Sequence, residues 1–427
     1  MDLRPHEEAA DLTQLAIAQP LGLRVFNRTG GALRRIGVPL VDLSPAALFD
    51  RARRLTGLSD FGDPFFREPM RVLLDSFETE AELTTLGRVI ARTDTVRLLQ
   101  NRLRMADVLN HHPELADGEI RQPIFIVGMP RTGTTILHEL MAQDPANRVP
   151  MTWEAMYPWP PPERDTYETD PRIRIVEKHF SGVDRLIPGF KSMHPMGAQL
   201  PQECVVLTSH DFASMVFSTT HFVPSYHAWL DRADLRWVYA AHRRQLQYLQ
   251  WRCPADRWVL KSPGHLWALD ALLAIYPDAR IVQTHRDPLK VIASLANLVA
   301  LLRSMSSDHI DRAAIGAEWT ARLADGMQRS MDVRDHLPPD TAPVFDMHFA
   351  DFIHDEIGMV RRIYEHFGME LSLDAEERMR HFLAQNPKDK HGAHRYVLED
   401  AGLNAETERE RYRAYQERFG IESEERG

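Results

Sequence analysis

The sequence predicts an α/β fold: a P-loop-type parallel sheet flanked by helices, with a helical N-terminal extension and a helical C-terminal region. Three observations support this prediction. Residues 44–114 show helical periodicity with charged faces and no strong strand signal. From Pro123 onward, short apolar segments alternate with helical patterns, which is typical of parallel βαβ units. A glycine-containing loop joins the first apolar segment to the first of these helical patterns.

The chain contains no flexible linker that would divide it into independent parts. We therefore predict a helical extension over residues 1–118 that packs on a main domain over residues 119–427, the two forming one compact unit. With 427 residues, the chain is long enough to bury a sizeable core.

Four strands are predicted in the main domain, and three of them are followed by a helix. The strands lie at Pro123–Val127, Trp258–Leu260, Ala279–Thr284 and Pro343–Met347, and the helices at Thr134–Ala142, His265–Ile275 and Leu289–Leu302. Parallel strands this apolar are usually buried on both faces, so we expect helices on both sides of the sheet.

Two further regions differ from this pattern. Residues 150–190 are rich in proline and aromatic side chains, and we predict a loop there because proline disfavours regular helix. Near the C-terminus, a basic and histidine-rich stretch from Asn386 to Tyr396 precedes a charged helix predicted over Asn404–Phe419.

Composition excludes several classes of protein. A formal net charge of −10 argues against nonspecific nucleic-acid binding. The two cysteines, Cys204 and Cys253, can build neither a disulfide framework nor a zinc site. No signal peptide is recognisable, and no apolar run approaches the roughly 20 residues of a membrane span. We expect a cytoplasmic protein without a transmembrane segment.

The loop Gly128-Met-Pro-Arg-Thr-Gly-Thr-Thr135 lies between a predicted strand and a predicted helix. Backbone N–H groups at such a helix start can converge on one anion, which the helix dipole also favours. Loops that bind ATP or GTP carry a lysine before the final hydroxyl residue, but here that position is Thr134 and the cation is Arg131 inside the loop. The pattern favours an anionic donor other than a magnesium-bridged triphosphate. A tight turn without ligand is the alternative.

Two more cations, Lys261 and Arg286, are predicted at the carboxyl ends of strands, where open parallel sheets bind their ligands. The segments around them, Leu260-Lys-Ser-Pro263 and Thr284-His-Arg-Asp-Pro288, occur in order after the loop. In this combination the sequence resembles sulfotransferases that use 3′-phosphoadenosine-5′-phosphosulfate (PAPS), especially the bacterial branch and the tyrosylprotein sulfotransferases. The resemblance covers about residues 120–300 and implies that residues 119–427 form the PAPS-binding domain.

The resemblance implies a role for individual residues. The loop would bind the 5′-phosphosulfate, Arg286 and Ser294 the 3′-phosphate, and Lys390 would stand for the basic segment that covers the nucleotide in cytosolic members. The expected donor-binding residues are Pro130, Arg131, Thr132, Gly133, Thr134, Thr135, Arg286, Ser294 and Lys390. Lys261 is the implied catalytic lysine. For Arg286 and Ser294, a structural ion pair with Asp287 or a capping role is the alternative.

Sulfuryl transfer builds negative charge on the bridging oxygen of the leaving adenosine bisphosphate. Arg131 and Lys261 are the expected cations for this charge, and the arrangement calls for no metal. The acceptor hydroxyl also needs a base. The resemblance favours Glu154, in Thr152-Trp-Glu154, with His265 or His194 as rivals.

The acceptor is expected to be a small molecule or a lipid alcohol or phenol. Aromatic residues in Trp153–Trp159 and Phe212–Trp229 would contact it, although such residues are more often part of the core. Two other functions stay open: a P-loop nucleotide-dependent kinase, and a noncatalytic nucleotide-binding protein of the same fold. The N-terminal helices could supply a surface for a homodimer.

Overall fold

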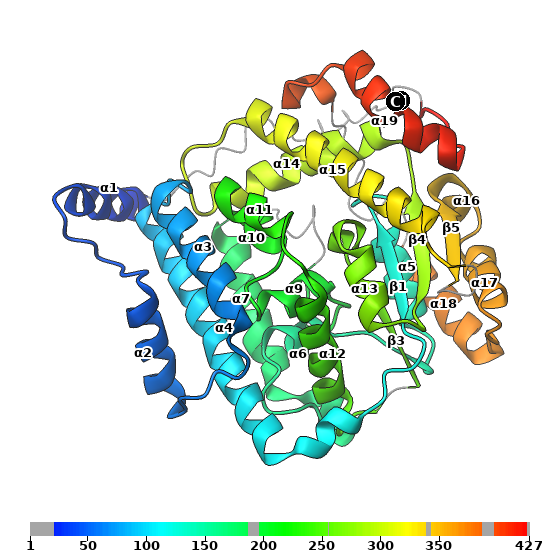
Figure 1. Cartoon of the computed structure of the whole chain (residues 1–427), viewed down its shortest axis with the longest axis horizontal. Coiled ribbons are helices and arrows are strands. Elements are labelled where there is room, and N and C mark those ends of the chain that lie inside the picture. The colour runs from blue at the N-terminus through cyan, green and yellow to red at the C-terminus, as the bar shows by residue number, and fades with distance from the viewer. Residues whose placement is uncertain (1–20, 187–195, 255, 339–342, 387–396, 425–427) are drawn as a thin grey trace, which may run out of the picture.

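The computed structural model describes residues 21–186, 196–254, 256–338, 343–386 and 397–424. Its centre is a parallel sheet with the strand order β2-β3-β1-β4-β5 (Figure 1). The strands are β1 (Ile124–Gly128), β2 (Asn147–Arg148), β3 (Arg257–Lys261), β4 (Arg280–His285) and β5 (Val344–His348). All four predicted strands are present. The sequence did not indicate β2, which has two residues and is too short to leave a pattern.

Helices surround this sheet and build the N-terminal part of the chain. Before β1 lie α1 (Leu21–Arg35), α2 (Pro45–Thr56), α3 (Arg67–Thr79) and α4 (Thr85–His111). Between β1 and β3 lie α5 (Thr134–Met141), α6 (Thr152–Met156), α7 (Pro171–Leu186), α9 (Cys204–Ser209), α10 (Val216–Thr220), α11 (Pro224–Leu230) and α12 (Arg236–Gln250). Further along come α13 (Leu269–Ile275), α14 (Pro288–Ser304), α15 (Arg312–Asp335), α16 (Phe349–His354), α17 (Glu356–His366), α18 (Leu373–Gln385) and α19 (Ala405–Phe419). No helix in the described ranges is both long and apolar enough to span a membrane.

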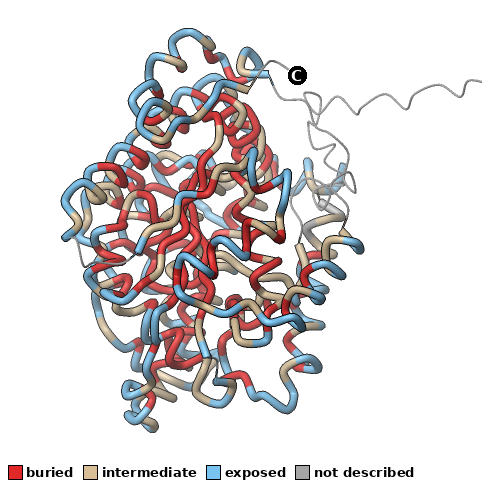
Figure 2. The backbone as a smooth tube through the Cα atoms, turned by 90° about the vertical axis from the view of Figure 1, so that its right-hand side faces the viewer, coloured by how far each residue is buried: buried red, intermediate tan, exposed pale blue. Residues whose placement is uncertain are grey.

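The central strand β1 is buried on both faces, as its uninterrupted apolar sequence predicts. Phe125 and Val127 belong to a core shared with α12 to α15. Ile124 and Ile126 point the other way, into a core shared with α5, α17 and α18. The buried backbone through the middle of the molecule is visible in Figure 2. Because both faces of β1 pack in hydrophobic cores, the position of β1 is fixed, and so is the start of the loop that follows it.

The N-terminal helices share a third core with the middle of the chain. Phe66, Leu73 and Leu99 pack in one cluster with Phe212 and Tyr226. These helices therefore lie against the segments α10 and α11, which are inserted between β2 and β3. The division at residues 118 and 119 stays a prediction.

The prediction of a loop over residues 150–190 is wrong for much of the segment. Helix α7 begins at Pro171. Proline is well tolerated at the first helical position, because an N–H group there would form no hydrogen bond within the helix. Helix α6 is completely buried, with Trp153 only 1% exposed. The prolines between these two helices lie in the connection over residues 157–170, which contains no α-helix.

Candidate functional site

The loop after β1 is held in place by small residues and by internal hydrogen bonds. At Gly133 the backbone has φ +86°, and a Cβ atom there would lie 3.0 Å from Phe352 Cδ1. Thr132 is fully buried and its Oγ1 donates to Met129 O at 2.6 Å. The same hydroxyl lies 2.6 Å from Thr284 Oγ1 on β4. The Thr132 side chain thus locks the loop onto the sheet, and only its backbone remains for a ligand.

Arg131 projects from this loop with a left-handed backbone, φ +66°. Such a conformation is uncommon for a residue with a side chain and is concentrated at functional sites. Arg131 is exposed and lines a cavity of about 1200 Å³ together with Pro130, Gly133, Thr134 and Thr135. The loop and the first turn of α5 therefore offer a guanidinium, two hydroxyls and backbone donors to the same space.

Lys261 ends β3, next to the loop, and is only 3% exposed. Its Nζ donates to Thr135 Oγ1 at 3.3 Å and to Glu203 Oε1 at 2.5 Å. Glu203 directly precedes α9, lines the cavity, and has a side chain that is 24% exposed. The structure thus joins the predicted lysine to an acid that sequence reasoning missed. The two residues are far apart in the chain, and no motif connects them.

Arg286 and Ser294, predicted for a second phosphate, both line the same cavity. Arg286 follows β4, its guanidinium carbon lies 4.0 Å from the centre of the Phe349 ring, and its Nη1 donates to Arg131 O at 2.9 Å. Asp287 does not pair with it, because its carboxylate is held by Arg409 at 2.6 and 2.7 Å. The ion pair that was the alternative explanation for Arg286 is therefore absent among the described residues.

Arg286 does bind a carboxylate, that of Glu424 near the end of the chain. Arg286 Nε donates to Oε1 at 2.8 Å and Nη2 to Oε2 at 2.9 Å. The backbone N–H of Glu424 donates to Asp287 Oδ2 at 2.8 Å. This two-pronged contact has the geometry with which arginine binds phosphate.

Glu154, predicted as the general base, is placed elsewhere. It is completely buried; Oε2 accepts from Arg148 Nη2 at 2.7 Å, and Oε1 from the Tyr167 hydroxyl at 2.8 Å and Met151 N at 3.1 Å. Arg148 in turn donates to backbone carbonyls and lies 4.5 Å from the Trp258 ring. The geometry corrects the prediction, because Glu154 does not line the cavity and its oxygens are already engaged.

We predict that Glu154→Gln mainly lowers stability. The substitution would leave the Arg148 cation buried without its counterion, which typically costs about 3–5 kcal/mol. Urea denaturation would measure this loss, with Glu163→Gln as the control because Glu163 forms an exposed pair with Arg252. The turnover of the folded enzyme should change little. A hundredfold loss of kcat with unchanged stability would contradict this prediction and would identify Glu154 as the general base.

His265 does not line this cavity either. It is 2% exposed, and its Nδ1 lies 2.7 Å from the Tyr239 hydroxyl. Burial and the nearby His242 hold the pKa of His265 well below its usual value, so the ring is neutral. The prediction of His265 as a base is therefore not supported by its position. His194 and Lys390 lie outside the described residues.

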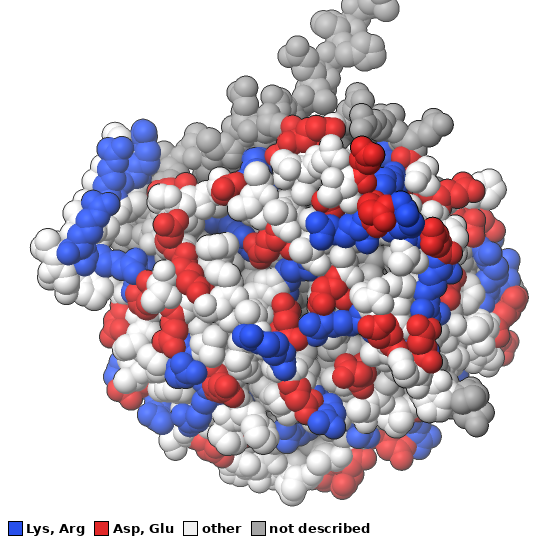
Figure 3. All heavy atoms as spheres, turned by 45° about the horizontal axis from the view of Figure 1, so that its top comes forward, with Lys and Arg blue, Asp and Glu red and all other residues white. Residues whose placement is uncertain are grey.

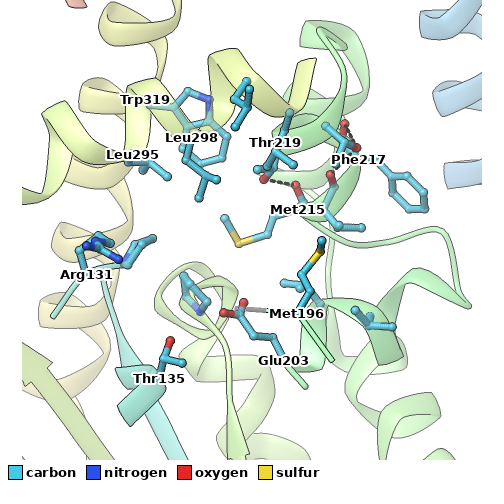
Figure 4. A pocket seen from close by; sticks show the side chains of 18 of the residues that line it. Arg131, Thr135, Met196, Glu203, Met215, Phe217, Thr219, Leu295, Leu298 and Trp319 are labelled. Carbon is cyan, nitrogen blue, oxygen red and sulfur yellow. Dashed lines mark hydrogen bonds between the residues drawn. The ribbon is translucent and has the colours of Figure 1, made fainter. Parts of the chain in front are cut away.

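The rest of the cavity is mainly apolar. Figure 4 shows Glu203 near Met196 and Met215, and Arg131 on the opposite side below Leu295. Leu298 and Trp319 lie across the open space from Thr135 and Glu203. Residues of α14 and the segment after it extend the lining away from the loop; these include Leu301, Leu302, Met305 and Ile310. The cavity surface is therefore mainly apolar, although other polar residues such as Arg97, Asn297 and Arg312 also line it.

The expected aromatic contacts with an acceptor are mostly wrong. Trp153, Phe212 and Tyr226 are buried in hydrophobic cores and do not line the cavity. Phe217 does line it. Aliphatic and methionine side chains of α14 and its neighbours line the cavity as well, as do aromatic residues outside the predicted segments, such as Phe180 and Trp319. In the described part of the chain, no group of three His, Cys, Asp or Glu side chains could hold a metal ion.

Comparisons with known proteins agree with this arrangement. A profile described as "Sulfotransferase family" matches residues 123–373. The omega-hydroxy-beta-dihydromenaquinone-9 sulfotransferase Stf3 of Mycobacterium bovis is 26% identical over 302 residues, 66% of this chain and 71% of that protein.

Two solved structures are similar over most of their length. Sulfotransferase STF1 from Mycobacterium tuberculosis has a TM-score of 0.77 and 37% identity, and the match covers 87% of this chain and 98% of STF1. Sulfotransferase STF9 from Mycobacterium avium has a TM-score of 0.83 and 30% identity, covering 89% of this chain and 98% of STF9.

Proposed function

Because this chain belongs to the sulfotransferase family and is a sulfotransferase, we propose that it transfers a sulfuryl group from PAPS to the hydroxyl of a lipid alcohol. One observation carries this proposal. Arg131, Glu203 and Arg286 line one largely apolar cavity. The buried Lys261 is not itself part of the lining, but it donates to Glu203 and Thr135, which are.

We assign the donor PAPS to the part of the cavity that the loop, Arg286 and Ser294 line. Backbone donors of the loop, with Arg131, Thr134 and Thr135, would hold the 5′-phosphosulfate. Arg286 and Ser294 would hold the 3′-phosphate. The hydrogen bond from Arg286 to Arg131 O supports this assignment, because it ties the Arg286 guanidinium to the backbone of the loop.

Lys261 and Glu203 would have different roles in the transfer reaction. In this reaction the acceptor oxygen forms a bond to sulfur while the bond from sulfur to the bridging phosphate oxygen breaks. Lys261 would stabilise the negative charge that grows on the bridging oxygen, an effect that is strong at a site shielded from water. Glu203 would accept the proton from the acceptor hydroxyl. Their contact of 2.5 Å holds both groups in a defined orientation before substrate binds.

A lipid acceptor fits the remainder of the chamber. Side chains such as Leu298, Leu302 and Met305 offer hydrocarbon surface with few hydrogen-bond donors, and burial of apolar substrate surface there would drive binding. The relative Stf3 is named for a hydroxylated dihydromenaquinone, which is a lipid.

The acceptor class can be tested by transfer of radiolabelled sulfate from PAPS. We expect long-chain and polyprenyl alcohols to be sulfated with much higher kcat/KM than short alcohols with the same reacting group. Efficient sulfation of soluble sugars, with no sulfation of any lipid alcohol, would contradict the proposed acceptor while leaving the donor unaffected.

Glu424 provides a further prediction, because its carboxylate binds the Arg286 guanidinium, to which the 3′-phosphate would bind. The phosphate must displace this carboxylate, and a partly exposed ion pair of this kind is worth about 0.2–1 kcal/mol. Glu424→Gln should therefore tighten the binding of adenosine 3′,5′-bisphosphate by about 1.4- to fivefold. Isothermal titration calorimetry measures the change.

The control for this experiment is Glu422→Gln, which removes an equal charge two residues away. We expect this control to leave the bisphosphate affinity unchanged. Equal affinities for all three proteins would mean that Glu424 and the phosphate do not compete for Arg286.

A further inference from the structure

Helix α1 carries an apolar stripe and a basic stripe side by side on its outer face. Leu21, Val25 and Phe26 are 70%, 55% and 40% exposed. Arg24 and Arg28 are exposed one turn apart, beside the apolar positions. Figure 1 shows α1 at the edge of the molecule, and Figure 3 shows its basic side chains next to uncharged surface.

The same character continues past the end of the helix. Arg35 is exposed, and Ile36, Val38 and Leu40 are 74%, 52% and 53% exposed. Residues 21–40 contain four arginines and no acidic residue, although the chain as a whole has a formal net charge of −10. The exposed surface of residues 21–40, which we call the α1 face, is thus a local basic and apolar region on an acidic protein.

The orientation of α1 is fixed by its inner face. Asn27 and Gly30 are buried against the start of α4. Asn27 Oδ1 accepts from Leu86 N at 2.9 Å, and Thr85 Oγ1 donates to Asn27 O at 3.2 Å. The remaining arginine, Arg34, pairs with Glu78 at 3.2 Å. These contacts leave the apolar stripe and the other arginines directed outward.

The α1 face lies close to one end of the apolar cavity. Thr84, at the start of α4, donates from its backbone N to Ser306 O at 2.9 Å. Ser307 follows directly and lines the cavity, as does Ala91 two turns further along α4. The helix that supports α1 is therefore also a wall of the chamber.

We propose that the α1 face docks on an anionic lipid bilayer and brings the apolar cavity to the membrane that holds the acceptor. This inference rests on the proposed function, because it explains how a lipid alcohol reaches the chamber. The exposed apolar side chains would enter the boundary between head groups and acyl chains, and the arginines would contact lipid phosphates. A membrane fits this face better than a protein groove does. Anionic head groups complement the arginines, and the bilayer boundary accepts apolar side chains that insert only to a shallow depth.

Flotation of the full-length protein with vesicles tests the proposal. We expect binding to vesicles of phosphatidylcholine with 30% phosphatidylglycerol, and weak binding to phosphatidylcholine alone. The triple variant Arg24→Glu/Arg28→Glu/Arg35→Glu should bind the anionic vesicles about a hundredfold more weakly. A control triple variant, Arg361→Glu/Arg378→Glu/Arg380→Glu, reverses three exposed charges on α17 and α18 and should bind more tightly than the α1 variant by at least tenfold.

The activity of the same variants separates this inference from the proposed function. The α1 variant should sulfate a soluble short-chain alcohol at the wild-type rate, and lose activity on a polyprenyl alcohol embedded in anionic vesicles. Wild-type protein that does not float with anionic vesicles would overturn the inference. So would a dimeric wild type that the α1 variant converts to monomer, because the occupant would then be a second copy. A failure to bind adenosine 3′,5′-bisphosphate would instead refute the proposed function.

Discussion

Lys261→Met is expected to lower kcat by about a hundred- to a thousandfold, the usual cost of removing one preorganised group that stabilises transition-state charge. The amine is only 3% exposed at the end of β3 and lies against the loop through Thr135. Its charge acts where solvent screening is weak, and it gains most when the bridging oxygen becomes anionic. Steady-state kinetics with saturating PAPS would measure the loss.

Two controls make this result specific. Lys178→Met removes an exposed lysine on α7 and should leave kcat unchanged. The affinity of Lys261→Met for adenosine 3′,5′-bisphosphate, measured by calorimetry, should fall far less than kcat. A kcat within tenfold of wild type would show that Lys261 does not stabilise the transition state.

Glu203→Gln is expected to lower kcat with aliphatic alcohols by about a hundred- to ten-thousandfold, the range for loss of a positioned general base. The amide keeps the size of the side chain but cannot take a proton. An acidic phenol needs less help in losing its proton, so the defect should be much smaller with such an acceptor. Rates for a series of acceptors of decreasing pKa would measure this difference.

Glu154→Gln is the matched control for this prediction, because both substitutions exchange a carboxylate for an amide. Glu203 lines the cavity with a partly exposed side chain, and Glu154 is enclosed by Arg148 and Tyr167. We expect the catalytic defect with Glu203→Gln and the stability defect with Glu154→Gln. An equal loss of kcat for every acceptor with Glu203→Gln would assign Glu203 a structural role beside Lys261.

Local sequence was sufficient to predict the sheet and the loop. A strand such as β1 is apolar throughout because it is buried on both faces, and that burial leaves a continuous signal. The same reasoning predicts Lys261 and Arg286 at strand ends. Arg286 lines the cavity with the loop, and Lys261 contacts two residues of the lining, Thr135 and Glu203. Short elements such as β2 are set by tertiary pairing with β3 and leave no such signal.

The proposed base could not be predicted in this way. Glu154 looked suitable because it lies shortly after the loop in an aromatic segment, but the aromatic neighbours belong to a core that encloses it with Arg148. Glu203 reaches the site through the folding of α9 against the sheet. Its proximity to Lys261 depends on contacts between segments that are 58 residues apart. Sequence spacing carries no information about such a contact.

The most direct test of the central claim is calorimetry with adenosine 3′,5′-bisphosphate and with ATP, both in EDTA, on wild type and Arg286→Ala. We expect the bisphosphate to bind the wild type without metal, ATP to bind much more weakly, and Arg286→Ala to lose about ten- to a hundredfold in bisphosphate affinity, as for one charge-assisted hydrogen-bonding group. Absence of bisphosphate binding, or equal affinity for wild type and Arg286→Ala, would contradict the two-part PAPS site formed by the loop and Arg286.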